Sequence, residues 1–196
     1  MNLTKLFKLA LLSIFVISCG SNQNDATAQE SNTTAKLTLM EFSDYQCPAC
    51  AYFHPIVDSL KKTYGNDLEV VYKDFPLNSH QYAALAARAA EAAKNQGKFL
   101  EMHNMLFENQ QQWASGSAQA RILGYAKEIG LDLDKFKEDL NAAETQKAVM
   151  EEKQEGVQMG VDSTPTFFIN GEKLQQNPPS YQDFKTLIDV YMKESN

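Results

Sequence analysis

The alternation of hydrophobic and polar residues predicts a few β-strands near the two ends of the chain. Residues 36–42 (KLTLMEF) alternate between the two classes, and residues 68–75 (LEVVYKDF) are rich in β-branched and aromatic side chains. A third strand is predicted over residues 166–169 (TFFI). An Asn-Gly pair follows it and favours a hairpin turn, so a returning strand is expected over residues 172–175.

Helical spacing of hydrophobic residues predicts one helix after the first strand and another at the end of the chain. Phe53, Val57 and Leu60 fall on one face of a helix over residues 48–63, and a proline occupies its first turn, where no N–H is needed. Apolar residues at the same spacing predict a final amphipathic helix over residues 181–191.

The middle of the chain, residues 79–160, predicts helices only. Its first helix is mostly alanine, a strong helix former whose small side chains let another helix approach closely. The order of elements is typical of an α/β fold with an all-helical insertion between the second strand and the hairpin. The expected helices of the insertion cover residues 83–93, 97–111, 117–129, 133–141 and 144–157.

The first 18 residues differ from the rest and predict export. Lys5 and Lys8 precede a short apolar run over residues 9–17, which is too short for a comfortable membrane span and is typical of a secretory signal. The following Ile-Ser-Cys-Gly resembles a bacterial lipoprotein signal. This resemblance implies that residues 1–18 are removed and that Cys19 carries a lipid; the alternative is an ordinary signal peptide with Cys19 incidental.

Residues 19–35 are polar and small, so they cannot bury enough surface to offset the entropy of ordering, and we expect a disordered tether. The remaining residues 36–196 are 
enough for one domain with its own core. With 18 basic against 25 acidic residues and a pI near 5.0, the chain has no basic footprint for nucleic acid.

Cys47-Pro48-Ala49-Cys50 is the segment that predicts chemistry. The thiolate is the nucleophile in disulfide exchange, and Cys47 falls just before a helix, where unpaired backbone N–H groups stabilise negative charge. Cys50 lies one turn inside, within reach of a mixed disulfide on Cys47. Two alternatives remain from spacing alone: half of a zinc site, with His54 at most a third ligand, and a purely structural disulfide.

The chain resembles the DsbA-like branch of thioredoxin-fold proteins over essentially all of residues 36–196. Three segments carry the resemblance: EFSDYQCPAC at residues 41–50, YKDFPL at residues 72–77 and STPTFFING at residues 163–171. It implies a thioredoxin-like α/β fold with the helical insertion at about residues 79–160. No metal and no organic cofactor are expected.

The resemblance also implies a role for each matching residue. Cys47 is expected to be the surface-exposed attacking cysteine and Cys50 the resolving one. Pro165 matches a cis-proline that faces the disulfide, and Thr164 would pair with a substrate strand. The sequence departs from the best-known pattern at Ala49, where a histidine is missing.

Four further residues and one short segment also have predicted roles or positions. Pro48 and Ala49 are predicted to touch the substrate along with Thr164. Glu41 is expected to be a buried acid that relays the proton of Cys50; the alternative is a solvated glutamate. Lys73 is a candidate partner for Glu41 across neighbouring strands. The Glu151-Glu152-Lys153 segment is expected to be a solvated helix face.

Together these features predict an exported, lipid-anchored, monomeric thiol–disulfide oxidoreductase facing the periplasm or the cell exterior. Its substrates would be exported proteins that contain cysteine, and a membrane redox partner would reset the disulfide. The direction most consistent with the resemblance is oxidation. A reductase or isomerase fed by a membrane electron donor is the alternative within the same chemistry, and a non-catalytic peptide-binding lipoprotein is the alternative from another class.

Overall fold

The computed structural model describes residues 35–194. The predicted signal peptide, Cys19 and the tether as far as residue 34 lie outside the described residues. The described part folds around a mixed sheet in the order β2-β1-β3-β4, with β1 and β2 parallel and the other two neighbouring pairs antiparallel. The strands are β1 (Leu37–Ser43), β2 (Leu68–Asp74), β3 (Thr166–Ile169) and β4 (Glu172–Lys173).

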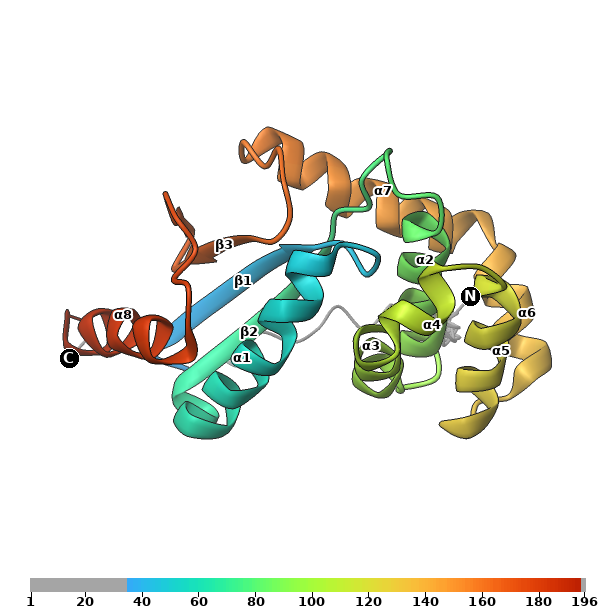
Figure 1. Ribbon diagram of the computed structural model, residues 1–196, viewed down its shortest axis with the longest axis horizontal. Helices are drawn as coiled ribbons and strands as arrows, with labels where there is room; N and C mark the ends of the chain where they lie inside the picture. Colours follow the sequence, from blue (N-terminus) through green and yellow to red (C-terminus); the bar gives the residue numbers. More distant parts are fainter. Residues whose placement is uncertain (1–34, 195–196) are drawn as a thin grey trace, which may run out of the picture. The chain divides into compact units, whose positions relative to one another are not determined.

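Two helices cover one face of this sheet (Figure 1). They are α1 (Pro48–Tyr64), which continues into the short 3-10 helix η1 (Gly65–Asp67), and α8 (Tyr181–Glu194). Val57 and Leu60 of α1 and Ile188 of α8 pack on the side chains that β1, β2 and β3 direct to this face. The helical spacing seen in the sequence therefore corresponds to burial against the sheet.

The helical insertion lies between β2 and β3, as the order of elements predicted. Its core forms around Trp113, Phe136 and the alanines of residues 83–94, and Tyr45, Cys47 and Cys50 pack into the same cluster. One predicted helix is divided: the side-chain amide of Asn109 donates to the Met105 carbonyl at 3.0 Å and ends α3 before α4 begins. The insertion consists of α2 (Ala83–Lys94), α3 (Phe99–Glu108), α4 (Gln110–Ala114), α5 (Ala118–Glu128), α6 (Leu133–Asn141) and α7 (Ala143–Gln158).

The end of α7 covers the other face of the sheet. There Phe42 of β1 and Phe75 after β2 meet edge to face at a centroid distance of 6.3 Å, and Gly156 of α7 lies directly on their rings. The prediction of a solvated face at residues 151–153 is wrong at two positions. Glu152 accepts a hydrogen bond from the Asp74 N–H at 2.7 Å, and Lys153 donates to the Pro76 carbonyl at 2.6 Å.

Replacing Gly156 with alanine is expected to destabilise the protein, although alanine is the better helix former. A Cβ at this position would lie 2.8 Å from Phe75 Cδ2 and 2.9 Å from Phe42 Cδ1, and both rings are buried. Overpacking of this kind lowers the free energy of unfolding by about 1–3 kcal/mol. Gly124→Ala in α5 is the matched control, because nothing lies within 4 Å of its Cβ position.

The control should gain roughly 0.5–1 kcal/mol from helix propensity alone. Urea unfolding of both variants and the parent measures the two changes. An increase in stability for Gly156→Ala equal to that of Gly124→Ala would contradict the close packing of α7 on the sheet.

Candidate active site

Cys47 is the N-cap residue of α1, and its backbone is extended, with φ −74° and ψ 122°. Its N–H donates to the Asp44 carbonyl at 3.0 Å, and its carbonyl accepts the first helical bond from Ala51 at 3.2 Å. Pro48 is the first helical residue, so the sequence begins the helix where the motif needs it. The sulfur of Cys47 consequently lies at the end of α1 where backbone N–H groups are unpaired.

The surroundings of the Cys47 sulfur favour its thiolate. The pKa of Cys47 falls to about 5 chiefly because the Cys50 thiol donates a hydrogen bond to it, with further support from the Thr164 side chain and from the backbone N–H groups of Cys50 and Ala49. Burial acts against this lowering. The thiol Sγ donates to the Thr164 carbonyl at 3.4 Å, and Thr164 Oγ1 is buried without a hydrogen-bond partner, free to turn its O–H toward the thiolate.

Cys50 has the opposite character. It is fully buried one turn into α1, and the Asp44 N–H donates to its sulfur at 3.4 Å. Burial raises the pKa of Cys50 far above that of an ordinary thiol, and the hydrogen bond to Cys47 and the charge of Glu41 raise it further. The two cysteines therefore divide the chemistry: Cys47 is the thiolate of the pair, and Cys50 keeps its proton.

The expectation that Cys47 is openly exposed is wrong. Only 7% of the residue is accessible, because the Thr164 backbone lies against its sulfur. Pro48 and Ala49, which were predicted to meet the substrate, are both exposed beside it. Because Cys50 is completely enclosed, a sulfur from another molecule can approach the pair only through the opening at Cys47.

The Thr164–Pro165 peptide bond is cis, as the resemblance implied. Pro165 is buried and leads directly into β3, and its carbonyl accepts a hydrogen bond from the Asn177 side chain at 2.8 Å. The structure thus brings residues 47 and 164 together from positions 117 apart in the chain.

Glu41 is buried on the face of β1 that α1 covers, with 2% of its surface exposed. Burial raises the pKa of its carboxyl to about 8, and the charge of Asp58 adds to this, while the Ser43 hydroxyl opposes it. Glu41 Oε1 and Ser43 Oγ are both buried without a well-aligned partner. The Glu41 carboxyl is therefore neutral at neutral pH, and the alternative of a solvated glutamate does not hold.

Lys73 is not the partner of Glu41. Glu41 is opposite Tyr72 in the parallel pair of β1 and β2, so Lys73 is directed to the other face of the sheet. There its ammonium pairs with Glu155 at 3.0 Å and with Glu152 at 3.6 Å, both on α7. The sequence could not settle this point because a shift of one residue in register exchanges the two faces.

The side chain of Asp44, for which no functional role was predicted, holds the loop before the cysteines. Its carboxylate is completely buried and accepts hydrogen bonds from the Gln46 N–H at 2.7 Å, the Leu77 N–H at 2.8 Å and the His80 ring at 2.8 Å. The contact with Gln46, two residues on, is an Asx turn that the local sequence could have indicated. The contacts with Leu77 and His80 depend on the fold and tie this loop to the segment after β2.

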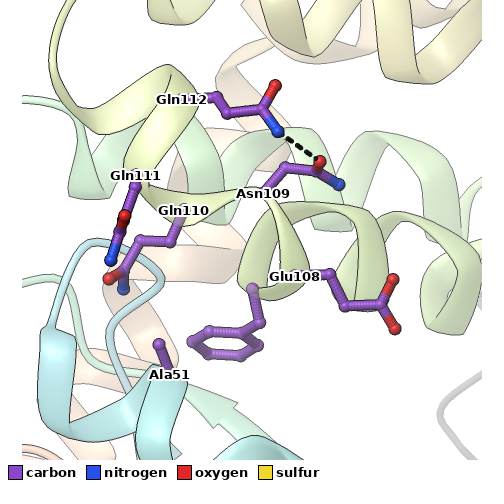
Figure 2. Close-up of a pocket in the computed structure, with 7 residues that line it drawn as sticks. Ala51, Glu108, Asn109, Gln110, Gln111 and Gln112 are labelled. Carbon is purple, nitrogen blue, oxygen red and sulfur yellow. Dashed lines mark hydrogen bonds between the residues drawn. The ribbon is translucent and has the colours of Figure 1, made fainter.

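A second residue near the cysteines comes from the helical insertion, where the sequence predicted only a helix end at residues 110–112. Gln110, the first residue of α4, places its amide beside the loop that leads into α1 (Figure 2). The amide nitrogen donates to the carbonyls of Tyr45 and Cys47 at 2.8 and 2.9 Å. The Tyr45 hydroxyl in turn forms a hydrogen bond with the ring of His103 at 3.0 Å. Helices α3 and α4 therefore both contact residues 44–47, which we call the redox loop.

Within residues 35–194 no three His, Cys, Asp or Glu side chains gather in a way that could hold a metal ion. His54, the candidate third ligand, stacks on Phe107 at a centroid distance of 5.1 Å, and its Nε2 lies 4.0 Å from Asp58. The described helices also include none that is both long and apolar enough to cross a bilayer.

The comparison with known proteins decides the family. Residues 26–190 match the family model described as thioredoxin. The chain belongs to the thioredoxin family. Among solved structures, it is similar to a thioredoxin-like oxidoreductase from Silicibacter pomeroyi DSS-3, at 27% identity and a TM-score of 0.70, over 83% of this chain and 90% of that one. It is also similar to the oxidoreductase DsbA from Xylella fastidiosa, at 18% identity and a TM-score of 0.67, over 83% and 87%.

The predicted thioredoxin-like fold with its helical insertion is thereby confirmed. A curated relative, the Na⁺/H⁺ antiporter NhaA 1 of Mycobacterium sp. (strain KMS), is 38% identical over 144 residues, which are 71% of this chain and 22% of the antiporter. The chain thus spans about a fifth of the length of the curated relatives it matches.

Proposed function

We propose that this thioredoxin-family protein is an exported protein disulfide oxidant, which passes a Cys47–Cys50 disulfide to proteins that contain cysteine. The observation that carries the proposal is the contrast between its two thiols: the pKa of Cys47 is lowered to about 5, and that of Cys50 is strongly raised. A stabilised Cys47 thiolate stabilises the reduced protein, so the Cys47–Cys50 disulfide readily oxidises the thiols of a substrate.

Exchange would begin when a substrate thiolate attacks Cys47, the sulfur that can be reached. The Cys47–Cys50 bond breaks, a mixed disulfide forms between the substrate and Cys47, and Cys50 leaves as a thiolate. The next step is the transfer of a proton to the Cys50 thiolate. The neutral Glu41 carboxyl carries such a proton, and it is close enough that its charge raises the pKa of Cys50. Glu41 would give this proton to Cys50 and become a carboxylate.

A second substrate thiolate would then attack the substrate sulfur of the mixed disulfide. The substrate leaves as a disulfide, and Cys47 departs as a thiolate, which its low pKa makes a good leaving group. Two electrons have passed from the substrate to the protein. A membrane redox partner would accept them as the Cys47–Cys50 bond forms again, while the Cys50 proton returns to Glu41.

The substrate would lie across Thr164 and Pro165, where its backbone could add alongside the chain that enters β3. A hollow of about 540 Å³ beside Pro165 supports this, and its lining includes the polar side chains of Asp162, Ser163 and Asn177. Export and anchoring through Cys19 belong to the same proposal, since a disulfide donor acts where thiols are not kept reduced.

Two measurements on residues 36–196 test this function. The oxidised domain should accelerate the refolding of a reduced, cysteine-containing test protein, and its equilibrium with glutathione should favour the reduced domain. An equilibrium that strongly favours the disulfide would point instead to the reductase. No acceleration at all, from a domain whose disulfide is intact, would overturn the proposed enzyme and favour a binding protein.

A further inference from the structure

Gln110 makes an unusually well-defined contact between the helical insertion and the redox motif. Its side-chain nitrogen donates one hydrogen to the Tyr45 carbonyl at 2.8 Å and the other to the Cys47 carbonyl at 2.9 Å. Because both partners are carbonyl oxygens, which only accept, the nitrogen of the amide must be the atom that faces them. The residue is 8% exposed, so water does not readily replace either bond.

We propose that Gln110 is a positioning residue, which fixes the peptide group of Cys47 and so sets how readily the Cys47 sulfur carries negative charge. The inference rests on the proposed function, because this charge decides how strongly oxidising the disulfide is. It extends that function because the helical insertion, and not only the Cys-x-x-Cys segment and the cis-proline turn, would then help to set the oxidising strength of the disulfide.

The first argument is geometric. Proline at position 48 has no N–H, so the backbone donors that favour the thiolate are those of Ala49 and Cys50. Their direction relative to the sulfur depends on the orientation of the peptide group that follows Cys47. The Ala51 N–H bonds to the carbonyl of this group only at 3.2 Å, so the shorter bond from Gln110 adds a second restraint on it.

The second argument is electrostatic. The Tyr45 and Cys47 carbonyl oxygens carry partial negative charge close to the place where the thiolate forms. The two amide hydrogens of Gln110 lie against these oxygens and offset that charge, in a site where burial weakens screening by water. Without the Gln110 amide, both carbonyl oxygens would lose this hydrogen bond. Their uncompensated negative charge would then make the Cys47 thiolate less favourable.

The position of Gln110 is itself fixed by the insertion. Trp113, three residues later on the same side of α4, is completely buried and donates to the Leu106 carbonyl at 2.7 Å. This anchor sets the rotation of α4 and aims Gln110 at the redox loop. Gln111 and Gln112, its neighbours in the polar pocket of Figure 2, are exposed.

The test compares Gln110→Met with Gln111→Met, which makes the same chemical change at an exposed position of the same helix. The thiolate absorbance of the reduced protein is titrated with pH, and the equilibrium with glutathione is measured at pH 7. Gln110→Met is expected to raise the pKa of Cys47 by about one unit, and this moves the equilibrium about ten-fold toward the protein disulfide. Gln111→Met should leave both values unchanged.

A purely structural role would lower the unfolding temperature of Gln110→Met and leave its thiolate titration and glutathione equilibrium unchanged, which would overturn the inference. If this variant does not fold, Gln110→Glu takes its place, since its carboxyl has one hydrogen at most for two carbonyls. Its Cys47 pKa should rise further, and an unchanged value would overturn the inference. An ordinary thiol pKa in the parent protein would overturn the proposed function as well, whereas a low parental pKa that these variants leave unchanged overturns the role of Gln110 alone.

Discussion

Replacing Cys47 with serine is expected to reduce thiol–disulfide exchange to the uncatalysed rate. A serine hydroxyl is not ionised at neutral pH and forms no disulfide, and the remaining sulfur of Cys50 is completely enclosed with a strongly raised pKa. Refolding of a reduced test protein, followed with the parent and the variant at equal concentration, measures the loss. Activity retained in Cys47→Ser would remove Cys47 from the role of attacked sulfur.

Cys50→Ser provides the complementary test. This variant keeps the reactive Cys47 thiolate but has no sulfur to displace a bound partner, so it should accumulate mixed disulfides with glutathione or a substrate thiol. Its hydroxyl can still donate to the Cys47 sulfur, which preserves the largest contribution to the low pKa. Mass spectrometry detects the adduct. An adduct on Cys50 of the Cys47→Ser variant, rather than on Cys47 of this one, would reverse the assigned roles.

The second large effect concerns Glu41 and the pH dependence of stability. The carboxyl has a pKa of about 8 in the folded protein and an ordinary value of 4.5 when unfolded. The folded state therefore binds this proton more tightly, and stability is lost as pH rises from 4.5 toward 8 and is then constant. At pH 7 this loss is about 3 kcal/mol, at 1.36 kcal/mol for each pKa unit.

Glu41→Gln removes that loss, because a neutral amide has nearly the same shape and no proton to lose. Urea unfolding of the reduced proteins should show little difference at pH 4.5 and an increasing advantage for the variant up to pH 8. Cys47 has the opposite effect on stability, because its depressed pKa of about 5 makes the reduced form more stable as pH rises toward 9. This contribution is the same in the parent and the variant, so it cancels in the difference between them. A difference between the two proteins that does not change with pH would show that Glu41 is ionised throughout.

Much of the site could be predicted because its evidence is local in the chain. Cys47, Pro48 and Cys50 are consecutive or one helical turn apart, and the proline that begins α1 is visible in the sequence itself. The cis bond before Pro165 could be predicted only through the resemblance, since Thr-Pro alone favours a trans turn. The spacing of hydrophobic residues likewise predicted which side of each strand or helix is buried, because residues at the helical or strand period lie on one face of the element.

Only the tertiary structure decided which residues from distant parts of the chain are in contact. The strand register sent Glu41 and Lys73 to opposite faces of the sheet, and the covering helix α1 then kept the Glu41 carboxyl neutral. Gln110 reaches Cys47 across 63 positions in the chain, through a helix that Trp113 orients. The sequence by itself therefore determined which atoms could react and where helices and strands form, since these follow from neighbouring residues. Which polar groups surround the reacting sulfur, and how strongly they tune it, was decided only by folding, because packing alone brings those groups out of water and into contact.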